Sequence, residues 1–290
     1  MDSPPPENSL PPETPQTPAE AAPAPASPPV PFAEFPEDLR GPWTGTDVLL
    51  FIGFAIGSQL VLEYVLINIF VNLGMVRADP VVIRVFSSSN ALYVTIRQLA
   101  WSVVLLAFLF YLLRPRSRDG FWRTIGWRPA SASAVPRASA YWVYLLCGVP
   151  LAIFIQFLSA MAQPEREVPM QVFFRDKQSV LLLTGMGILV APLVEETLFR
   201  GFLYPVLARR WGPAGGVLLT GLLFGLLHAA QLWGAWVQIG LLMLVGFVFT
   251  AVRAWTKSVV PCYFLHLGYN AFLFVGFFIG TRGLQNLPVR

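Results

Sequence analysis

The stretch Ala191-Pro-Leu-Val-Glu-Glu-Thr-Leu-Phe-Arg-Gly-Phe202 places two adjacent carboxylates and an arginine inside an otherwise apolar run. Neither residues 181–190 before it nor residues 201–208 after it include a charged side chain. An ionisable side chain at membrane depth costs about 2.5–3.5 kcal/mol on insertion scales. The three ionisable groups therefore indicate a buried ion-pair cluster, a transport site or a catalytic site.

The composition of the whole chain indicates a membrane protein. The chain has 290 residues, of which 55% are hydrophobic and 12% are charged, and its mean hydropathy is +0.60. Soluble domains have about 25% charged residues. The sequence therefore predicts an all-α, polytopic transmembrane helix bundle of seven to eight spans. The net charge of +4 does not indicate nucleic acid as a partner, because the basic residues lie between the apolar segments.

The first 42 residues differ in composition from the rest of the chain. Residues 1–42 contain 14 of the 26 prolines, together with many Ala and Glu. Such a segment cannot bury a hydrophobic core, so we expect a disordered, cytoplasmic tail rich in Pro and Ala. Leu39 and Trp43 are expected at the membrane interface. Residues 43–290 are predicted to form the transmembrane domain.

Seven apolar segments approach or exceed the roughly 20 residues that a membrane-spanning helix needs. The fourth segment is longer than one crossing requires, so we expect a long helix or one bent at Pro192. An eighth, split or re-entrant segment is the alternative. Glu63 in the first segment is expected to pair with Arg97 in the second. The predicted segments are 47–73, 92–113, 139–162, 178–209, 213–230, 233–254 and 258–280.

The charges between these segments predict how the protein lies in the membrane. Ten Lys and Arg residues lie in the even-numbered loops or at the segment ends beside them, Arg209 and Arg253 included, and five lie in the odd-numbered loops. Because cytoplasmic loops carry the excess of positive charge, the even-numbered loops and the N-terminus are expected in the cytoplasm. We expect a multi-pass protein of the bacterial inner (cell) membrane.

The carboxylates of the opening stretch are expected to have separate roles. Glu196 and Arg200 are four residues apart, so on a helix they share a face and can pair. Glu195 is rotated from Glu196 by about 100° because a helix has 3.6 residues per turn. The simplest division gives the Glu196–Arg200 pair a structural role and leaves Glu195 for chemistry. A purely structural cluster of all three residues is the alternative.

Two further polar motifs lie in later apolar segments. Phe224-Gly-Leu-Leu-His228 places an aromatic ring where it can support an imidazole, and His266-Leu-Gly-Tyr-Asn270 projects two polar groups from one helix face. Each motif alone also fits hydrogen bonding within a core. Together with Glu195, they can activate water and stabilise an oxyanion. The same carboxylate and imidazoles can also ligate a zinc-like ion.

The three motifs, in this order, resemble those of the CPBP family. The residues that carry the resemblance are Glu195-Glu196-x-x-x-Arg200, Phe224-x-x-x-His228 and His266-x-x-x-Asn270. The family includes the type II CAAX prenyl endopeptidases and the bacterial Abi proteins. The similar region covers about residues 178–275, and the resemblance implies an intramembrane endopeptidase that acts on a membrane-associated protein or peptide.

The family's residue roles can be carried onto the matching positions of this chain. The resemblance implies that Glu195 activates the attacking water and that His228 helps to position this water. It implies that His266 and Asn270 hold the scissile carbonyl and its developing oxyanion. Glu196 and Arg200 then keep the helix and Glu195 in place, and Phe224 is a supporting residue beside the ring of His228.

The resemblance leaves the cofactor open. The family has been described both as metalloproteases and as metal-independent glutamate proteases, and Glu195, His228 and His266 permit either. No cofactor is therefore assigned, and a divalent metal such as zinc stays an option. The expected partners are a peptide or membrane-protein substrate and the lipid bilayer. Neither the substrate nor the oligomeric state can be read from the sequence. An ion- or proton-coupled transporter and a non-catalytic membrane scaffold are the alternative functions.

Overall fold

The computed structural model describes residues 1, 32, 34–130, 141–162, 173–174 and 176–287. Most of the predicted tail lies outside the described residues. The chain divides into a first unit, Met1–Val30, and a compact second unit, Pro31–Arg290. The regular structure of the described residues is entirely helical, so the predicted all-α class is confirmed.

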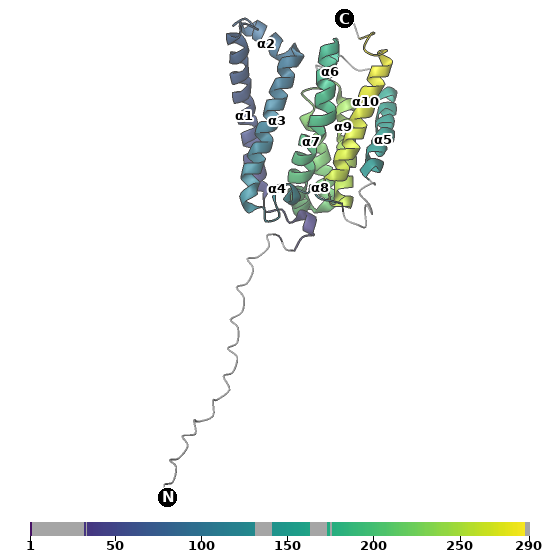
Figure 1. Ribbon diagram of the computed structural model, residues 1–290. Helices are drawn as coiled ribbons and strands as arrows, with labels where there is room; N and C mark the ends of the chain where they lie inside the picture. Colours follow the sequence, from purple (N-terminus) through teal and green to yellow (C-terminus); the bar gives the residue numbers. More distant parts are fainter. Residues whose placement is uncertain (2–31, 33, 131–140, 163–172, 175, 288–290) are drawn as a thin grey trace. The chain divides into compact units, whose positions relative to one another are not determined.

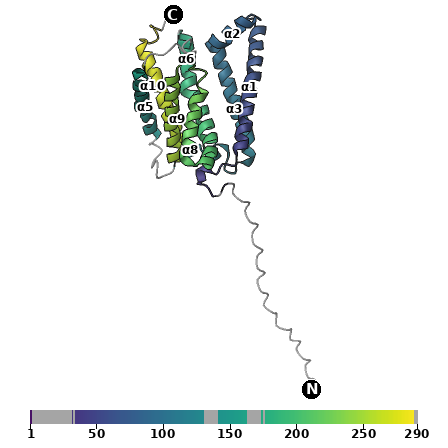
Figure 2. The same ribbon diagram turned by 180° about the vertical axis from the view of Figure 1, so that it is seen from behind.

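The second unit is a bundle of helices. Figures 1 and 2, which view it from opposite sides, show α1 beside α3 at one flank and α5 beside α10 at the other, with α6 to α9 between them. The helices, with η for 3₁₀ or π segments, are η1 (Glu37–Leu39), α1 (Gly45–Asn72), α2 (Pro80–Ser89), α3 (Ala91–Leu113), η2 (Arg114–Arg116), α4 (Phe121–Thr124), α5 (Tyr141–Met161), α6 (Lys177–Gly185), η5 (Met186–Val190), α7 (Ala191–Glu195), η6 (Glu196–Leu203), α8 (Tyr204–Leu227), α9 (Trp236–Thr256) and α10 (Val260–Gly280).

Among the described residues, six helical runs are long and apolar enough to cross a membrane. They indicate a multi-pass integral membrane protein. One run, of 51 residues, includes both the fourth and the fifth predicted segments, which is why the runs number six and not seven or eight. The runs are Gly45–Asn72, Ala91–Arg116, Tyr141–Met161, Lys177–Leu227, Trp236–Thr256 and Val260–Gly280.

The 51-residue run is not one continuous α-helix. Trp211 and Gly212 have non-helical backbone angles, and the φ of Gly212 is +74°. Glycine tolerates this left-handed conformation, and the following Pro213 cannot donate a backbone hydrogen bond. The chain therefore kinks at Gly212. Pro192, where a bend was expected, lies between the two π segments η5 and η6. The number of crossings and their orientation remain predictions.

The predicted pairing of Glu63 with Arg97 is confirmed. The guanidinium Nη1 of Arg97 binds Oε2 of Glu63, and the hydroxyl of Tyr93 donates to Oε1 of the same carboxylate at 3.0 Å. Each side chain is about one quarter to one third exposed. The pair joins α1 to α3, where each charge compensates the other at membrane depth.

Glycines bring the helices of the bundle into close contact. A Cβ added to Gly268 in α10 would lie 1.9 Å from the backbone oxygen of Leu145 in α5. A Cβ added to Gly246 in α9 would lie 2.9 Å from Cα of Gly221 in α8. Small residues permit such backbone approach between membrane helices. These contacts fix the helices on which the two histidines lie.

The segment before α1 packs against one end of the bundle. Leu39 and Trp43 are buried, although both were expected at the membrane interface. Leu39 lies in a cluster with Tyr204 and Ala208 of α8, and Trp43 joins the core between α1, α3 and η6. Residues 34–42, which the sequence analysis placed in the tail, therefore belong to the compact unit.

Candidate active site

The two adjacent carboxylates lie at a junction between helix types. Glu195 is the last residue of α7 and Glu196 is the first residue of the π segment η6. Pro192 has no backbone N–H, which interrupts the regular hydrogen bonding of the helix just before this point. The hydroxyl of Thr197 donates to the backbone oxygen of Leu193 at 2.7 Å. Short π segments inside α-helices are frequent at functional sites.

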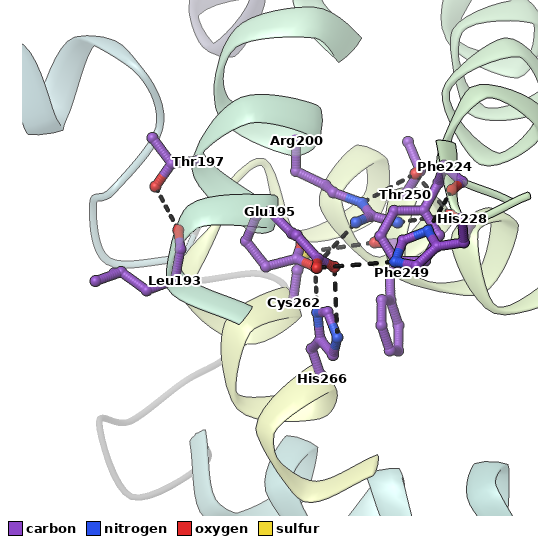
Figure 3. Close-up of polar contacts among 12 residues, drawn as sticks. Leu193, Glu195, Thr197, Arg200, Phe224, His228, Phe249, Thr250, Cys262 and His266 are labelled. Carbon is purple, nitrogen blue, oxygen red and sulfur yellow. Dashed lines mark hydrogen bonds and ion pairs between the residues drawn. The ribbon is translucent and has the colours of Figure 1, made fainter. Parts of the chain in front are cut away.

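The carboxylate of Glu195 faces both histidines of the chain. Its Oε1 lies 3.9 Å from Nε2 of His228, and its Oε2 lies 3.9 Å from Nε2 of His266 (Figure 3). These distances are too long for direct hydrogen bonds and short enough for one water to reach both groups of a pair. The Glu195 side chain is 24% exposed and that of His228 is 21% exposed. Both groups are therefore partly accessible from outside the protein core.

The His228 ring is oriented by a backbone carbonyl at the end of α8. Its Nδ1 lies 2.7 Å from the backbone oxygen of Phe224. A carbonyl oxygen only accepts hydrogen bonds, so we assign the proton to Nδ1. In the neutral ring, Nε2 then presents a lone pair toward Glu195. The Phe224 ring packs against the imidazole, with 4.9 Å between the ring centroids.

Glu196 connects two cationic or protonatable groups inside the core. It is fully buried, and its Oε1 accepts from Nη1 of Arg200 at 2.9 Å. The same oxygen lies 2.9 Å from Nδ1 of His266. Arg200 also donates to the hydroxyl of Thr250 at 3.2 Å and to the backbone oxygen of Gly246 at 3.1 Å. These acceptors satisfy much of the hydrogen-bonding capacity of the guanidinium. The Glu196 carboxylate compensates its charge, as the burial of an ion pair requires.

Sequence reasoning did not find the contact of Glu196 with His266 or that of Arg200 with Thr250. The first pair is 70 residues apart and the second pair is 50 residues apart. Local spacing carries no signal for such contacts, because they depend on how η6, α9 and α10 pack against each other. The result is that Glu196 fixes the ring of His266 in addition to pairing with Arg200.

Asn270 of α10 binds to η5, the π segment that precedes Pro192. Its amide Nδ2 donates to the backbone oxygen of Gly187, in η5, at 2.7 Å. Among the described residues, its hydrogen-bond partner is this carbonyl and not Glu195 or a histidine. Asn270 lies one helical turn from His266, on the same face of α10. One of its two amide hydrogens is therefore engaged in joining α10 to η5.

The option of a metal centre is not supported. Among the described residues, no group of three or more His, Cys, Asp or Glu side chains is arranged to hold a metal ion. Within the ligand set that the sequence left open, Glu195 lies 3.9 Å from Nε2 of His228 and from Nε2 of His266. A carboxylate and two imidazoles in this arrangement can act on water.

Comparison with known protein families agrees with the motifs. Residues 177–272 match the family model described as type II CAAX prenyl endopeptidase Rce1-like. The matched segment begins at α6, ends within α10 and includes Glu195, Glu196, Arg200, His228, His266 and Asn270. The match confirms the resemblance seen in the three motifs. Searches of curated proteins and of solved structures gave no match to this chain.

Proposed function

We propose that the chain is an intramembrane endopeptidase in which Glu195 activates a water for attack on a peptide bond. One observation carries the proposal: the Glu195 carboxylate lies 3.9 Å from Nε2 of both His228 and His266. The match of residues 177–272 to an endopeptidase family supports the same reaction class. The substrate is a membrane-associated protein or peptide, since the site lies on helices that are apolar enough to cross a membrane.

The first step is general base catalysis. A water between Glu195 and His228 donates one hydrogen bond to the carboxylate and one to the lone pair on Nε2 of the imidazole. Glu195 takes the proton as the water oxygen forms a bond to the carbonyl carbon. General base catalysis of this kind contributes about 10²–10⁴-fold to a rate. The Phe224 carbonyl holds the His228 ring in the orientation that this step needs.

The second requirement is a donor for the developing oxyanion. We assign this role to Nε2–H of His266 in its imidazolium form and to the second amide N–H of Asn270. The Glu196 carboxylate, 2.9 Å from Nδ1 of His266, stabilises the positive charge on that ring. Arg200 holds Glu196 in place. Donors that are fixed before the reaction stabilise an oxyanion strongly in a site that excludes bulk water.

The last step returns the proton. The tetrahedral intermediate collapses as the C–N bond breaks, and protonated Glu195 donates its proton to the leaving nitrogen. The products are a new carboxyl terminus and a new amine, and Glu195 is again a carboxylate. No covalent bond to the protein forms at any point.

The experiment is cleavage by the purified full chain in proteoliposomes. The substrates are a farnesylated peptide that ends in a CAAX sequence, the same peptide without the lipid, and an unmodified transmembrane peptide. Mass spectrometry identifies the new termini. We expect the wild-type chain and the exposed control Glu34→Gln to cleave at least one substrate and Glu195→Gln to leave it intact. Equal cleavage by Glu195→Gln would overturn the proposal. So would Glu195-dependent proton or ion uptake in the absence of peptidase activity.

A further inference from the structure

Two tryptophan side chains from outside the matched segment hold the π segment η6. Trp127 follows α4, and Trp43 precedes α1, so neither lies within residues 177–272. Each donates its indole N–H to an atom of η6, the segment that begins at Glu196. The two contacts lie near opposite ends of this segment, and neither belongs to the proposed chemistry.

Trp127 binds next to the catalytic carboxylates. Its Nε1 donates to the hydroxyl oxygen of Thr197 at 3.0 Å. Thr197 is fully buried and in turn donates to the backbone oxygen of Leu193 at 2.7 Å (Figure 3). The hydroxyl is therefore both donor and acceptor, and it links the indole to the helix on either side of Glu195. A π segment has i→i+5 hydrogen bonds in place of the regular α-helical ones and is rare beyond a single turn, so we infer that such external partners help to hold it.

The same tryptophan is also tied to α10, which carries His266. The Gly126 oxygen accepts from the backbone N–H of Val259 at 2.9 Å, just before α10 begins. Gly126 has a φ of +92°, which glycine adopts without strain. The Trp127 ring contacts Tyr263 of α10, with 5.5 Å between the ring centroids. Trp127 thus connects the segment that carries the carboxylates with the helix that carries His266.

Trp43 holds the other end of η6. Its Nε1 donates to the backbone oxygen of Phe202 at 2.8 Å, and its side chain is almost completely buried. The backbone of Trp43 is itself fixed, because Arg209 of α8 donates to its carbonyl oxygen. A buried indole N–H that satisfies a buried carbonyl is costly to remove, since the carbonyl then loses its partner.

We propose that Trp127 and Trp43 are positioning residues for the proposed reaction. Their indole N–H groups hold η6 so that Glu195 and Glu196 keep their distances from His228 and His266. Trp127 has the larger effect because it acts beside Glu196 and also contacts α10. The inference rests on the proposed function, and it assigns part of the control of the active site to segments outside the matched family region.

The test uses substitutions that keep the ring and remove the N–H. Trp127→Phe and Trp43→Phe are compared with Trp255→Phe, which changes an exposed tryptophan of α9. Thr197→Val removes the acceptor of the Trp127 indole. We expect Trp127→Phe to lower kcat about tenfold, with little change in KM. This loss is smaller than the roughly 10²-fold that a misplacement of 1 Å can cost. The double variant Trp127→Phe/Thr197→Val should lose about as much as the larger single loss, because both remove the same contact.

A second readout separates positioning from loss of folded protein. The chain has only two histidines, so ring nitrogen resonances of labelled histidine report on His228 and His266 alone. We expect Trp127→Phe to move the resonances of His266 and Trp255→Phe to leave both rings unchanged. Active-site titration corrects kcat for the folded fraction. If the corrected kcat and the His266 resonances both match the wild type, the inference is wrong while the proposed function stands. If Glu195→Gln cleaves as well as the wild type, the proposed function fails first.

Discussion

Nδ1 of His266 lies 2.9 Å from Oε1 of Glu196, the carboxylate next to the proposed catalytic base. The same oxygen accepts from Arg200, so Glu196 joins a permanent cation to a protonatable ring. Glu195, by contrast, lies 3.9 Å from each histidine and is partly exposed. Two adjacent residues of one type therefore lie in different environments, which is how proteins give two carboxylates different roles.

The first prediction concerns the unequal stability of the two Glu→Gln variants. Glu196→Gln removes the charge that compensates fully buried Arg200, and breaking a buried pair costs about 3–5 kcal/mol. Glu195→Gln removes a partly exposed charge whose nearest polar groups lie 3.9 Å away, so we expect a change of less than about 1 kcal/mol. Denaturant unfolding of both variants in the same detergent measures the difference. A Glu196→Gln variant as stable as wild type would contradict the structural role of the pair.

The second prediction tests the contact between α5 and α10. Gly268→Ala would place a Cβ 1.9 Å from the Leu145 carbonyl oxygen, so the two helices must separate. Overpacking of this kind costs about 1–3 kcal/mol, and it displaces the helix that carries His266 and Asn270. We expect a lower Tm together with reduced cleavage.

Gly276→Ala is the matched control on the same helix. A Cβ at this position would have no atom within 4 Å, and alanine favours a helix by about 1 kcal/mol over glycine. We expect the Tm of this variant to be equal to or above that of the wild type. An equal effect of Gly268→Ala and Gly276→Ala on Tm and cleavage would rule out the close helix contact.

The third prediction concerns the segment that precedes α1. Asp38 and Arg253 form an ion pair at 3.0 Å, with side chains 4% and 1% exposed, and Arg253 also donates to the Asp38 backbone oxygen. Asp38→Asn leaves a buried guanidinium without its counter-charge, which costs about 3–5 kcal/mol. The control is Glu37→Gln, because the Glu37 carboxylate that binds Arg128 is 79% exposed and such pairs contribute about 0–1 kcal/mol. Similar unfolding curves for the two variants would contradict the burial of the Asp38–Arg253 pair.

The fourth prediction concerns metal removal. Among the described residues, no set of three ligand side chains is arranged for a metal, and no proposed step uses one. We expect the cleavage rate to be unchanged after dialysis against a strong chelator. Loss of cleavage that a divalent metal restores would require a different arrangement of Glu195, His228 and His266.

The sequence predicted those features that depend on segment length and local spacing. Long apolar runs gave the helical class, and the charges of Glu63 and Arg97 inside neighbouring runs gave their pairing, because each charge needs a partner at membrane depth. The span count could not be predicted in the same way. The run from Lys177 to Leu227 is one long helical run in which apolar residues predominate, and its kink depends on the backbone at Trp211 and Gly212.

Contacts between distant segments required the structure. The order of the three motifs was sufficient for the family resemblance, but no spacing indicates that Glu196 meets His266 or that Trp127 meets Thr197. The burial of Leu39 was also not predicted. The composition of residues 1–42 is dominated by proline, so it does not indicate which few residues pack against the bundle. These features arise from how whole helices pack against each other, and the periodicity of a single segment does not indicate that packing.

The most direct measurement is single-turnover cleavage, with the enzyme in excess over a substrate peptide, by wild type and by Glu195→Gln. This regime isolates the chemical step from product release. We expect the rate constant to fall by at least about 10²-fold, the lower limit for loss of a general base, while the resonances of both histidines show a folded site. A rate constant within about twofold of the wild type, far less than general base catalysis contributes, would contradict the role of Glu195 as the base.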